Sequence, residues 1–385
     1  MRRLPKSVWA LGFVSMFMDV SSEIIHALLP LFLKTALGAS VAVVGVIDGV
    51  AESTASITKV FSGYLSDKTR KRKPLILIGY GLGALTKPLF AVAASPALIL
   101  GARFADRIGK GLRGAPRDAL IADVTPAALR GRAFGLRQSL DTVGAVAGPL
   151  LAIALMSLFA GDFRMVFWVA AIPAAVAVVL VIAGVREPDR LSDAPPAPPI
   201  SIRDFSRFDA AYWSIVAIAV LMTLARFSEA FLILKAHDVG LAIALAPAVL
   251  VVMNLVYACG AYPAGVAADR FSARTLLLVG LAALIAADAL LATATSLFAT
   301  FAGVVLWGVH MALTQGLFAK LVADHAPDAL RGSAFGLFNL ATGLTMLAAS
   351  VIAGVLWTAF GPEWTFVAGG AFALAAAGLA SARLR

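Results

Sequence analysis

The chain has 385 residues, of which 61% are hydrophobic and only 14% are charged, and its formal net charge is +10. Soluble domains carry about 25% charged residues, so this composition excludes an ordinary soluble protein. The single cysteine, Cys259, excludes intramolecular disulfides.

The apolar residues fall in runs of about 20, the length that crosses a hydrocarbon core about 30 Å thick. These runs lack the alternation of β-barrel strands and therefore predict a helical membrane protein. The first run begins near Ser7 and is long enough to remain as a spanning helix, and no cleavable signal peptide is apparent. We predict twelve crossings, at residues 7–34, 40–66, 74–94, 97–122, 131–158, 163–184, 209–235, 241–267, 274–294, 297–321, 331–358 and 363–382.

Lysine and arginine residues gather in the loops on one side of these crossings, and the densest cluster is Lys68 to Lys73. The loops on the other side, such as residues 94–96, are short and nearly free of basic residues. By the positive-inside rule, the basic loops and both termini are predicted to be cytoplasmic. This topology signal accounts for the net charge and argues against a nucleic-acid partner.

The longest interval between crossings, residues 186–208, is rich in proline and predicts a flexible or extended linker. It separates an N-terminal six-helix bundle, residues 1–185, from a C-terminal six-helix bundle, residues 209–385.

The two halves carry a sequence repeat. Residues 123–136, DVTPAALRGRAFGL, recur 201 residues later as DHAPDALRGSAFGL, and Gly63 and Asp67 recur as Gly265 and Asp269. Two motifs displaced by nearly the same distance indicate a tandem duplication. Each half has an even number of crossings, so both halves insert in the same orientation, related by a pseudo-two-fold axis along the membrane normal.

These motifs resemble signatures of the major facilitator superfamily, and the resemblance covers essentially the whole chain. Residues 63–73, GYLSDKTRKRK, are similar to the signature of loop 2–3, although Arg70 stands where a glycine is usual. The Asp123 and Asp324 motifs are similar to the acidic-x6-Arg-Gly signature of loops 4–5 and 10–11. Weaker similarities join residues 107–115 to the fourth-helix signature and residues 144–149 to a fifth-helix signature associated with antiporters.

The resemblance implies an all-α membrane protein of twelve transmembrane helices in two pseudo-symmetric six-helix bundles. It implies a secondary transporter of a bacterial cytoplasmic membrane that alternates between inward-open and outward-open states, with a cavity lined by helices 1, 4, 7 and 10. The expected partners are the lipid bilayer, a small-molecule substrate and protons, and the protein is expected to act as a monomer without nucleic acid. We expect no cofactor and no metal, and the histidines lack the spacing of a metal site.

The resemblance also implies a cytoplasmic gate, in which Asp67 lies at the N-terminus of helix 11 and Arg70 and Arg72 reach Asp123. The alternative interpretation is a solvated loop whose charges only fix the orientation of the protein. The candidate gate residues are Gly63, Asp67, Arg70, Arg72, Asp123, Arg130, Gly265, Asp269, Asp324 and Arg331.

Ionisable residues inside a membrane cost several kcal/mol unless they are paired or face water, so each is a functional candidate. In helix 1, Asp19, Glu23 and His26 fall within about 60° of arc. Helix 4 carries a stripe about 100° wide that contains Arg103, Asp106, Arg107, Lys110 and Arg117.

Helices 1 and 4 run in opposite directions, so residues at equal depth have a nearly constant sum of residue numbers. Asp19 with Lys110 gives 129, and Glu23 with Arg107 gives 130. We therefore expect the two stripes to face each other, with the carboxylates compensating the cations. The further candidates for coupling or substrate binding are Asp48 and Glu52 on helix 2, Arg137 and Asp141 on helix 5, Arg226 and Glu229 on helix 7, and His310 on helix 10.

Three interpretations of these charges remain open. They form a fixed ion-pair network, they couple transport to protons through Asp19, Glu23 or His26, or the cations of helix 4 bind an anionic substrate. His310 is alone on an apolar helix, as structural histidines commonly are, and Asp288 on helix 9 has no partner nearby in the sequence. Gly144 and Gly148 predict a close helix approach, either as ordinary small-residue packing or as an antiporter-like contact with the other half.

We expect rocker-switch transport, with proton-coupled export of a small organic or amphipathic solute as the preferred function. The alternative is proton-coupled uptake of an anionic or chelated nutrient such as a carboxylate, a phosphate ester or a siderophore-like compound. A membrane-embedded enzyme or receptor is disfavoured, because the sequence offers no nucleophile–base pair, no nucleotide-binding loop and no soluble domain.

Overall fold

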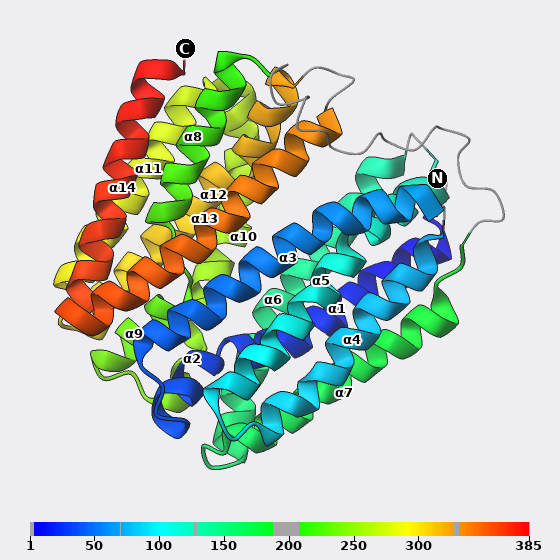
Figure 1. The fold of residues 1–385 in the computed structure, drawn as a ribbon, viewed down its shortest axis with the longest axis horizontal. Helices are drawn as coiled ribbons and strands as arrows, with labels where there is room; N and C mark the ends of the chain where they lie inside the picture. The colour runs from blue at the N-terminus through cyan, green and yellow to red at the C-terminus, as the bar shows by residue number, and fades with distance from the viewer. Residues whose placement is uncertain (1–3, 70, 127–128, 188–207, 327–330, 385) are drawn as a thin grey trace. The chain divides into compact units, whose positions relative to one another are not determined.

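The structure is a computed structural model, and it describes residues 4–69, 71–126, 129–187, 208–326 and 331–384. These residues are helical, with short connections, and Figure 1 shows their order along the chain. The predicted fold class, an all-α protein with twelve helical crossings, is confirmed.

The helix ends lie close to the predicted crossings, most of them within three residues. The helices of the first half are α1 (Lys6–His26), α2 (Leu29–Leu31), α3 (Val41–Thr69), α4 (Arg72–Val92), α5 (Pro96–Val124), α6 (Arg130–Leu158) and α7 (Phe163–Gly184). The helices of the second half are α8 (Ala210–Ala225), α9 (Ala230–Asp238), α10 (Ala248–Arg270), α11 (Ala273–Thr293), α12 (Leu297–His325), α13 (Arg331–Phe360) and α14 (Pro362–Arg383).

Eleven helical segments of the described residues are long and apolar enough to cross a membrane. The fourth crossing, α5, is equally long at 29 residues but carries eight charged residues. Several of these are buried, since Arg103, Asp106 and Arg107 are each less than 5% exposed. These three charges of α5 therefore face other helices rather than lipid.

The repeat extends to the helix boundaries. Ser95 caps the start of α5 by accepting a hydrogen bond from the Leu98 N–H at 3.3 Å, and Ser296, 201 residues later, accepts one from the Ala299 N–H at 3.3 Å at the start of α12. A serine at this position satisfies a backbone donor that the first turn leaves unpaired. The bounds of α4 and α11 differ by the same 201 residues.

The first and seventh crossings are each interrupted, which the sequence analysis did not predict. α1 ends at His26, because Pro30 has no N–H to donate to the His26 carbonyl. A short π-helix, Phe32–Ala36, completes that crossing. In the seventh crossing, α8 ends at Ala225 and α9 begins at Ala230, about 200 residues after the first interruption. The interruptions thus occupy corresponding positions of the two repeats.

The described residues divide into two compact units. The first contains residues 4–32 and 54–187, and the second contains residues 33–53 and 208–384. The predicted division placed residues 33–53 in the N-terminal bundle, and most of the predicted linker (residues 188–207) lies outside the described residues.

Glycines explain why the start of α3 belongs to the second unit, where it packs against α13. A methyl group at Gly49 would lie 3.0 Å from Leu347 Cα, and one at Gly354 would lie 2.9 Å from Ala42 Cα. The Ala42 N–H also donates a hydrogen bond to Thr358 Oγ1 at 3.1 Å. Only residues without a side chain allow the two backbones to approach this closely.

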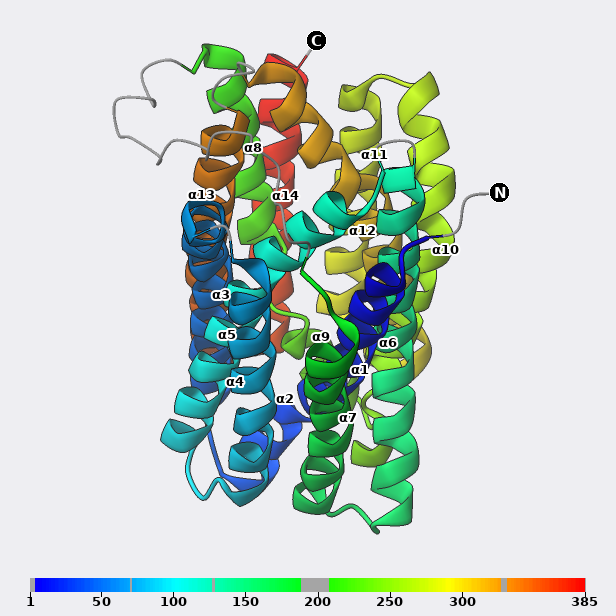
Figure 2. The same cartoon turned by 90° about the vertical axis from the view of Figure 1, so that its right-hand side faces the viewer.

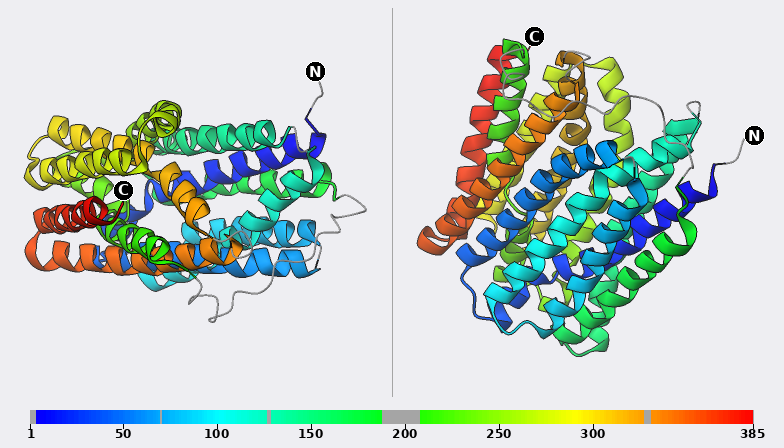
Figure 3. Two further views of the ribbon diagram at one scale, coloured as in Figure 1. Left: turned by 90° about the horizontal axis from the view of Figure 1, so that it is seen from above. Right: turned by 45° about the vertical axis from the view of Figure 1, so that its right-hand side comes forward.

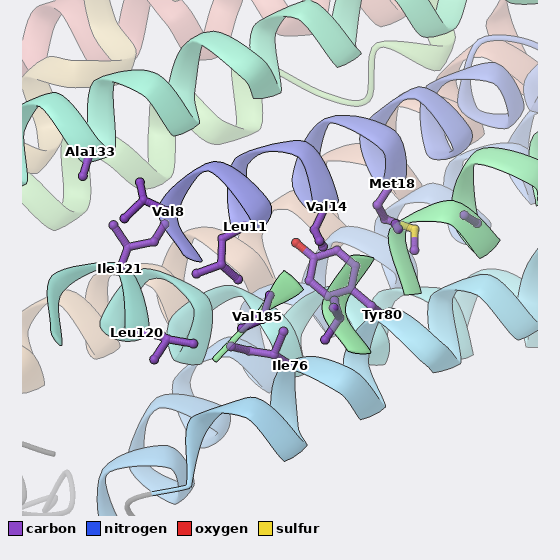
Figure 4. Close-up of a cluster of buried hydrophobic side chains, with 13 residues drawn as sticks. Val8, Leu11, Val14, Met18, Ile76, Tyr80, Leu120, Ile121, Ala133 and Val185 are labelled. Carbon is purple, nitrogen blue, oxygen red and sulfur yellow. The ribbon is translucent and has the colours of Figure 1, made fainter. Parts of the chain in front are cut away.

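Within the first unit, α1 packs against α6 and α7, and α4 packs against α5 (Figure 2). Fully buried side chains such as Val14 and Met18 on α1 and Ile76 and Tyr80 on α4 form its core (Figure 4). In the second unit, α11 packs against both α12 and α14 (Figure 3). Because lipid chains are as apolar as these side chains, close packing rather than the hydrophobic effect holds such helices together.

Candidate transport site

The carboxylates of α1 face the cations of α5 in the first unit. Glu23 and Asp19 are half-buried, one turn apart on α1, and α1 packs against α5. The charges of Lys110 and Arg107 act on Glu23, and the charge of Lys110 also acts on Asp19. This arrangement agrees with the facing stripes that the residue-number sums predicted.

His26 belongs to the same stripe. Its Nδ1 lies 3.5 Å from Glu23 Oε2, one turn earlier on α1. The Glu23 side chain is 24% exposed and that of His26 is 14% exposed, so both remain accessible to a solute or to water. The three predicted residues of helix 1 are therefore brought together, and the predicted helix 4 cations that act on their carboxylates are Arg107, Lys110 and Arg117.

The tightest ion pair in this unit involves a lysine that the sequence analysis missed. Lys87 Nζ on α4 lies 2.8 Å from Asp106 Oδ1 on α5 and donates a second hydrogen bond to Ser22 Oγ on α1 at 3.0 Å. Both charged side chains are 3% exposed or less. The position of Lys87 inside a predicted crossing could have identified it as a candidate, because ionisable residues are rare within membrane spans and usually have a functional role.

A second chain of ion pairs joins α5 to α6. Arg137 Nη1 lies 2.9 Å from Asp118 Oδ1, and Arg137 Nη2 lies 3.4 Å from Asp141 Oδ2. Arg117 Nε lies 3.1 Å from the same Asp118 oxygen, and the charges of Arg117 and Asp141 both act on Asp19. The predicted residues Arg137 and Asp141 thus join the α1 carboxylates in one network through Asp118, which was not predicted.

Arg113 on α5 is a further buried cation that was not predicted. Its guanidinium lies over the Tyr80 ring, 4.7 Å from the centroid, and donates to the Gly79 carbonyl at 3.4 Å. Cation–π contacts of this kind stabilise a desolvated cation. Arg103 is also buried, at 2% exposed, whereas Lys110 is exposed.

The two predicted glycines of helix 5 pack behind the α1 carboxylates. A methyl group at Gly148 would lie 2.5 Å from Glu23 Cβ, and one at Gly144 would lie 2.9 Å from Asp19 Cβ. The predicted close approach is therefore present. It joins two helices of the same unit, as ordinary small-residue packing does.

One contact of the predicted gate is also present in the first unit. Arg72 Nε lies 2.5 Å from Asp123 Oδ2, and Arg72 Nη1 donates to Ser66 Oγ at 3.0 Å. The Arg72 backbone N–H donates to the Glu187 carboxylate. Arg130 Nε donates to the Ala122 carbonyl at 3.2 Å.

The other candidate gate residues are not brought together in the described part of the structure. A methyl group at Gly63 would contact Ala115, Gly265 has open space where a side chain would be, and Asp324 is exposed. Arg70, together with the side chains of Asp67, Asp269 and Arg331, lies outside what the structure describes. Their role in a gate stays a prediction.

In the second unit, Asp48 organises the interruption between α8 and α9. Its Oδ2 accepts a hydrogen bond from Ser228 Oγ at 2.8 Å, and the same hydroxyl accepts one from the Ala230 N–H at 3.2 Å. Ser228 thereby satisfies a backbone donor at the start of α9. The sequence predicted Asp48 as a candidate but not this contact, because the two residues are 180 positions apart.

Arg226 lies within the same interruption. The charges of Glu229 and Glu52 act on its guanidinium, so the predicted residues of helices 2 and 7 form one group. His310, fully buried on α12, donates a hydrogen bond from Nδ1 to the Gly280 carbonyl at 2.9 Å, as the structural interpretation of this histidine expects.

Aromatic rings surround the interruption. The Phe227 ring lies 5.5 Å from the Trp307 ring and 5.3 Å from the Phe231 ring, measured between centroids. The second unit therefore offers an apolar, aromatic environment, in contrast to the charged network of the first.

Twelve helical crossings, buried ionisable side chains and paired interruptions in corresponding crossings of two repeats are the features of a secondary transporter. The chain belongs to the Major Facilitator Superfamily, whose family model matches residues 11–235 and 214–385. It is an integral membrane transporter of a small molecule and not an enzyme. The family expected from the sequence motifs is thereby confirmed.

Individual proteins support the same family. The chain is 32% identical to an uncharacterized MFS-type transporter of Methanocaldococcus jannaschii over 97% of this chain and 94% of that one. It is 30% identical to the multidrug resistance protein MdtH of Photorhabdus laumondii, but over only 38% of this chain and 36% of that one. Its fold is similar to that of the nucleoside transporter NupG, with a TM-score of 0.82, 14% identity and coverage of 98% of this chain and 100% of that one.

Proposed function

We propose that this transporter couples the export of a small amphipathic organic solute to the entry of protons. The observation that carries the proposal is the pair of α1 carboxylates, Asp19 and Glu23, whose opposing cations stand on a different helix, α5. A carboxylate that loses a cationic partner binds a proton more readily, and one that regains the partner releases it. Any movement between α1 and α5 therefore changes the proton affinity of these two side chains.

A fixed ion-pair network describes the Lys87–Asp106 pair well. It describes the α1 residues Asp19, Glu23 and His26 less well. The Lys87–Asp106 pair is 2.8 Å apart with both side chains 3% exposed or less. By contrast, Glu23 is 24% exposed, and the Nδ1 atom of its neighbour His26 lies 3.5 Å from Glu23 Oε2. A proton carrier has to be reachable from water at some stage of the cycle. Glu23 and Asp19 meet that requirement, whereas the buried Lys87–Asp106 pair holds the helices together.

The first unit and the relatives both support an organic solute with a polar end. The first unit supplies accessible charged groups such as Lys110 and Glu23, which suit the polar end of such a molecule. Partial similarity to proteins named for multidrug resistance is consistent with export of such a solute.

Proteoliposomes with an imposed pH gradient test this proposal. We expect uptake of a fluorescent organic dye to depend on the gradient, and we expect dye movement to drive proton movement in the opposite direction. A cationic dye (ethidium) and an anionic dye (carboxyfluorescein) serve as probes. Dye flux that ignores the pH gradient would remove proton coupling, and gradient-dependent flux of the dye together with protons would replace export by uptake.

A second candidate function is proton-coupled uptake of an anionic nutrient, and the charge balance of the first unit favours it. Within the described residues, the interactions of this network join six cations, Lys87, Arg107, Lys110, Arg113, Arg117 and Arg137, to five carboxylates, Asp19, Glu23, Asp106, Asp118 and Asp141. An arginine binds two oxygens of a carboxylate or phosphate at once. Competition of carboxyfluorescein transport by organic phosphates or dicarboxylates, with no effect on ethidium, would favour this alternative.

We also infer that the basic loops and both termini face the cytoplasm and that the Arg72–Asp123 contact belongs to a gate on that side. The charge asymmetry of the loops supports the orientation. Labelling of a cysteine introduced at Arg383 from either side of sealed vesicles tests it, with Cys259 replaced by serine as the background.

A further inference from the structure

The repeat reveals an asymmetry between the two units at one buried position. Adding the repeat offset of 201 to Lys87 gives Asp288, and adding it to Asp106 gives Trp307. The helices that carry these residues correspond, since α4 and α11 share the offset at both ends, as do α5 and α12. The second unit therefore has a carboxyl where the first has an ammonium, and an indole where the first has the countercharge.

The packing around these positions also repeats. In the first unit Gly79 approaches Gly109, and a methyl group at position 79 would lie 2.7 Å from the Gly109 carbonyl oxygen. The equivalent Gly280 lies against His310 and Thr314 on α12. Asp288 is thus positioned between helices as Lys87 is, rather than toward lipid.

Asp288 is fully buried, at 0% exposed, and neither carboxyl oxygen has a hydrogen-bond partner within the described residues. An ionised carboxylate in such a place would cost several kcal/mol, because nothing replaces the water that it loses. A neutral, protonated carboxyl avoids that cost.

Two groups, the Ala225 carbonyl and the Phe227 ring, meet the Asp288 carboxyl at Gly369 on α14. A methyl group at position 369 would lie 2.8 Å from Asp288 Oδ2, 3.1 Å from the Ala225 carbonyl oxygen and 3.1 Å from the Phe227 ring. Ala225 is the last residue of α8, and the last carbonyls of a helix lack an intrahelical donor. A protonated carboxyl has an O–H group of the kind that this carbonyl lacks as a donor, whereas an ionised one would place a negatively charged oxygen near a partially negative one.

These neighbours suit a proton better than a metal ion. A hard metal cation takes six or more oxygen ligands, and here the convergent groups are one carboxyl, one carbonyl and an aromatic ring. Arg226 and Glu229 lie at the interruption. The titratable groups of the two helices that α11 mainly packs against are His310, Lys320, Asp324 and His325 on α12 and Glu363 and Arg383 at the two ends of α14. The Nε2 atom of His310 and the Nε1 atom of Trp307 are buried without a hydrogen-bond partner in the described residues.

We propose that Asp288 is a proton-binding site of the second unit, distinct from the carboxylates of α1, and that its proton bridges to the Ala225 carbonyl at the interruption of the seventh crossing. Release of the proton removes that bridge and leaves an unpaired charge beside the interruption, so α8 and α9 rearrange until water or Trp307 Nε1 reaches the carboxylate. The link between this site and transport rests on the proton coupling proposed above. The binding of a proton to Asp288 does not depend on that coupling.

Infrared difference spectroscopy of the purified protein tests the proposal without a transport assay. We expect a carboxylic-acid C=O band that shifts in D2O and is lost in Asp288→Asn, whose side chain has the same shape and no titratable group. Glu363→Gln, which neutralises an exposed carboxyl at the start of α14, is the matched control and should keep the band. A band that survives in Asp288→Asn, or one that never exchanges with D2O, would overturn the proposal.

A second variant covers the case in which Asp288→Asn fails to fold. Gly369→Ala keeps the carboxyl and places a methyl group 2.8 Å from its oxygen, so the same band should shift in frequency. Gly378→Ala on the same helix, where no atom lies within 4 Å of the added group, should leave the band unchanged. Equal spectra for the two glycine variants would contradict the assignment. Because Glu23→Gln should leave this band intact, a failure of proton-coupled transport and a failure of this site are distinguishable.

Discussion

Lys87 and Asp106, on the neighbouring helices α4 and α5, form a buried ion pair 2.8 Å long inside the first unit. Ser22 on α1 accepts a further hydrogen bond from the same ammonium, so three helices meet at one charge. Removing one member of such a pair leaves the other charge buried and uncompensated.

We therefore expect Asp106→Asn to lower the free energy of unfolding by about 3–5 kcal/mol. The double variant Lys87→Met, Asp106→Leu removes both charges and should recover most of that loss. Thermal unfolding in detergent, monitored by circular dichroism, measures both. A double variant as unstable as Asp106→Asn would show that the pair does more than compensate its own charges.

Glu23→Gln should abolish proton-coupled transport and leave the unfolding temperature unchanged, because the side chain is 24% exposed and keeps its shape. The readout is dye flux under a pH gradient together with counterflow without a gradient. Loss of gradient-driven flux with intact counterflow is the expected result. Unchanged gradient-driven flux would return Glu23 to a structural role.

Gly148→Ala should destabilise the protein by about 1–3 kcal/mol, since its methyl group would lie 2.5 Å from Glu23 Cβ. Gly135→Ala on the same helix is the control, because no atom lies within 4 Å of the added group. That change should be neutral or stabilise the helix by up to about 1 kcal/mol. Unfolding temperatures of the two variants that move in the same direction would contradict the close α1–α6 approach.

Ser228→Ala should destabilise the second unit by about 0.5–2 kcal/mol, as loss of a helix cap generally does. The change removes the hydroxyl that donates to Asp48 and accepts from the Ala230 N–H. Ser228→Thr keeps the hydroxyl and serves as the control. Faster amide hydrogen exchange in α9 of the alanine variant only, measured by mass spectrometry, is the expected local signature.

Hydropathy and charge predicted the crossings well, because apolar runs of about 20 residues in so hydrophobic a chain are nearly always membrane-spanning helices. They did not predict the interruption after Ala225, because residues 226–229 contain neither proline nor glycine and the contact that holds Ser228 comes from Asp48. Pro30 did signal the first interruption and was not used. Tertiary hydrogen bonds decide where such a helix is interrupted, and these bonds cannot be predicted from residue spacing along one helix.

The candidate site was predicted in part for the same reason. Asp19, Glu23, Arg107 and Lys110 form periodic stripes, which one sequence reveals. Lys87 and Asp288 are each the only charged residue in the middle of an apolar helix, so periodicity says nothing about them. Comparison of the two repeats position by position would have paired them, because they are 201 residues apart.

The glycines of α6 and the carboxylates of α1 keep a constant difference of 125 in residue number, Gly144 with Asp19 and Gly148 with Glu23. One extra residue between the two glycines would rotate the second of them by about 100° away from α1 and would present a bulkier side chain to Glu23. The lengths of these two stretches are therefore tied to each other. Insertions and deletions in related chains should avoid both stretches or change both together, and fusion or circular permutation is best placed in the connections instead.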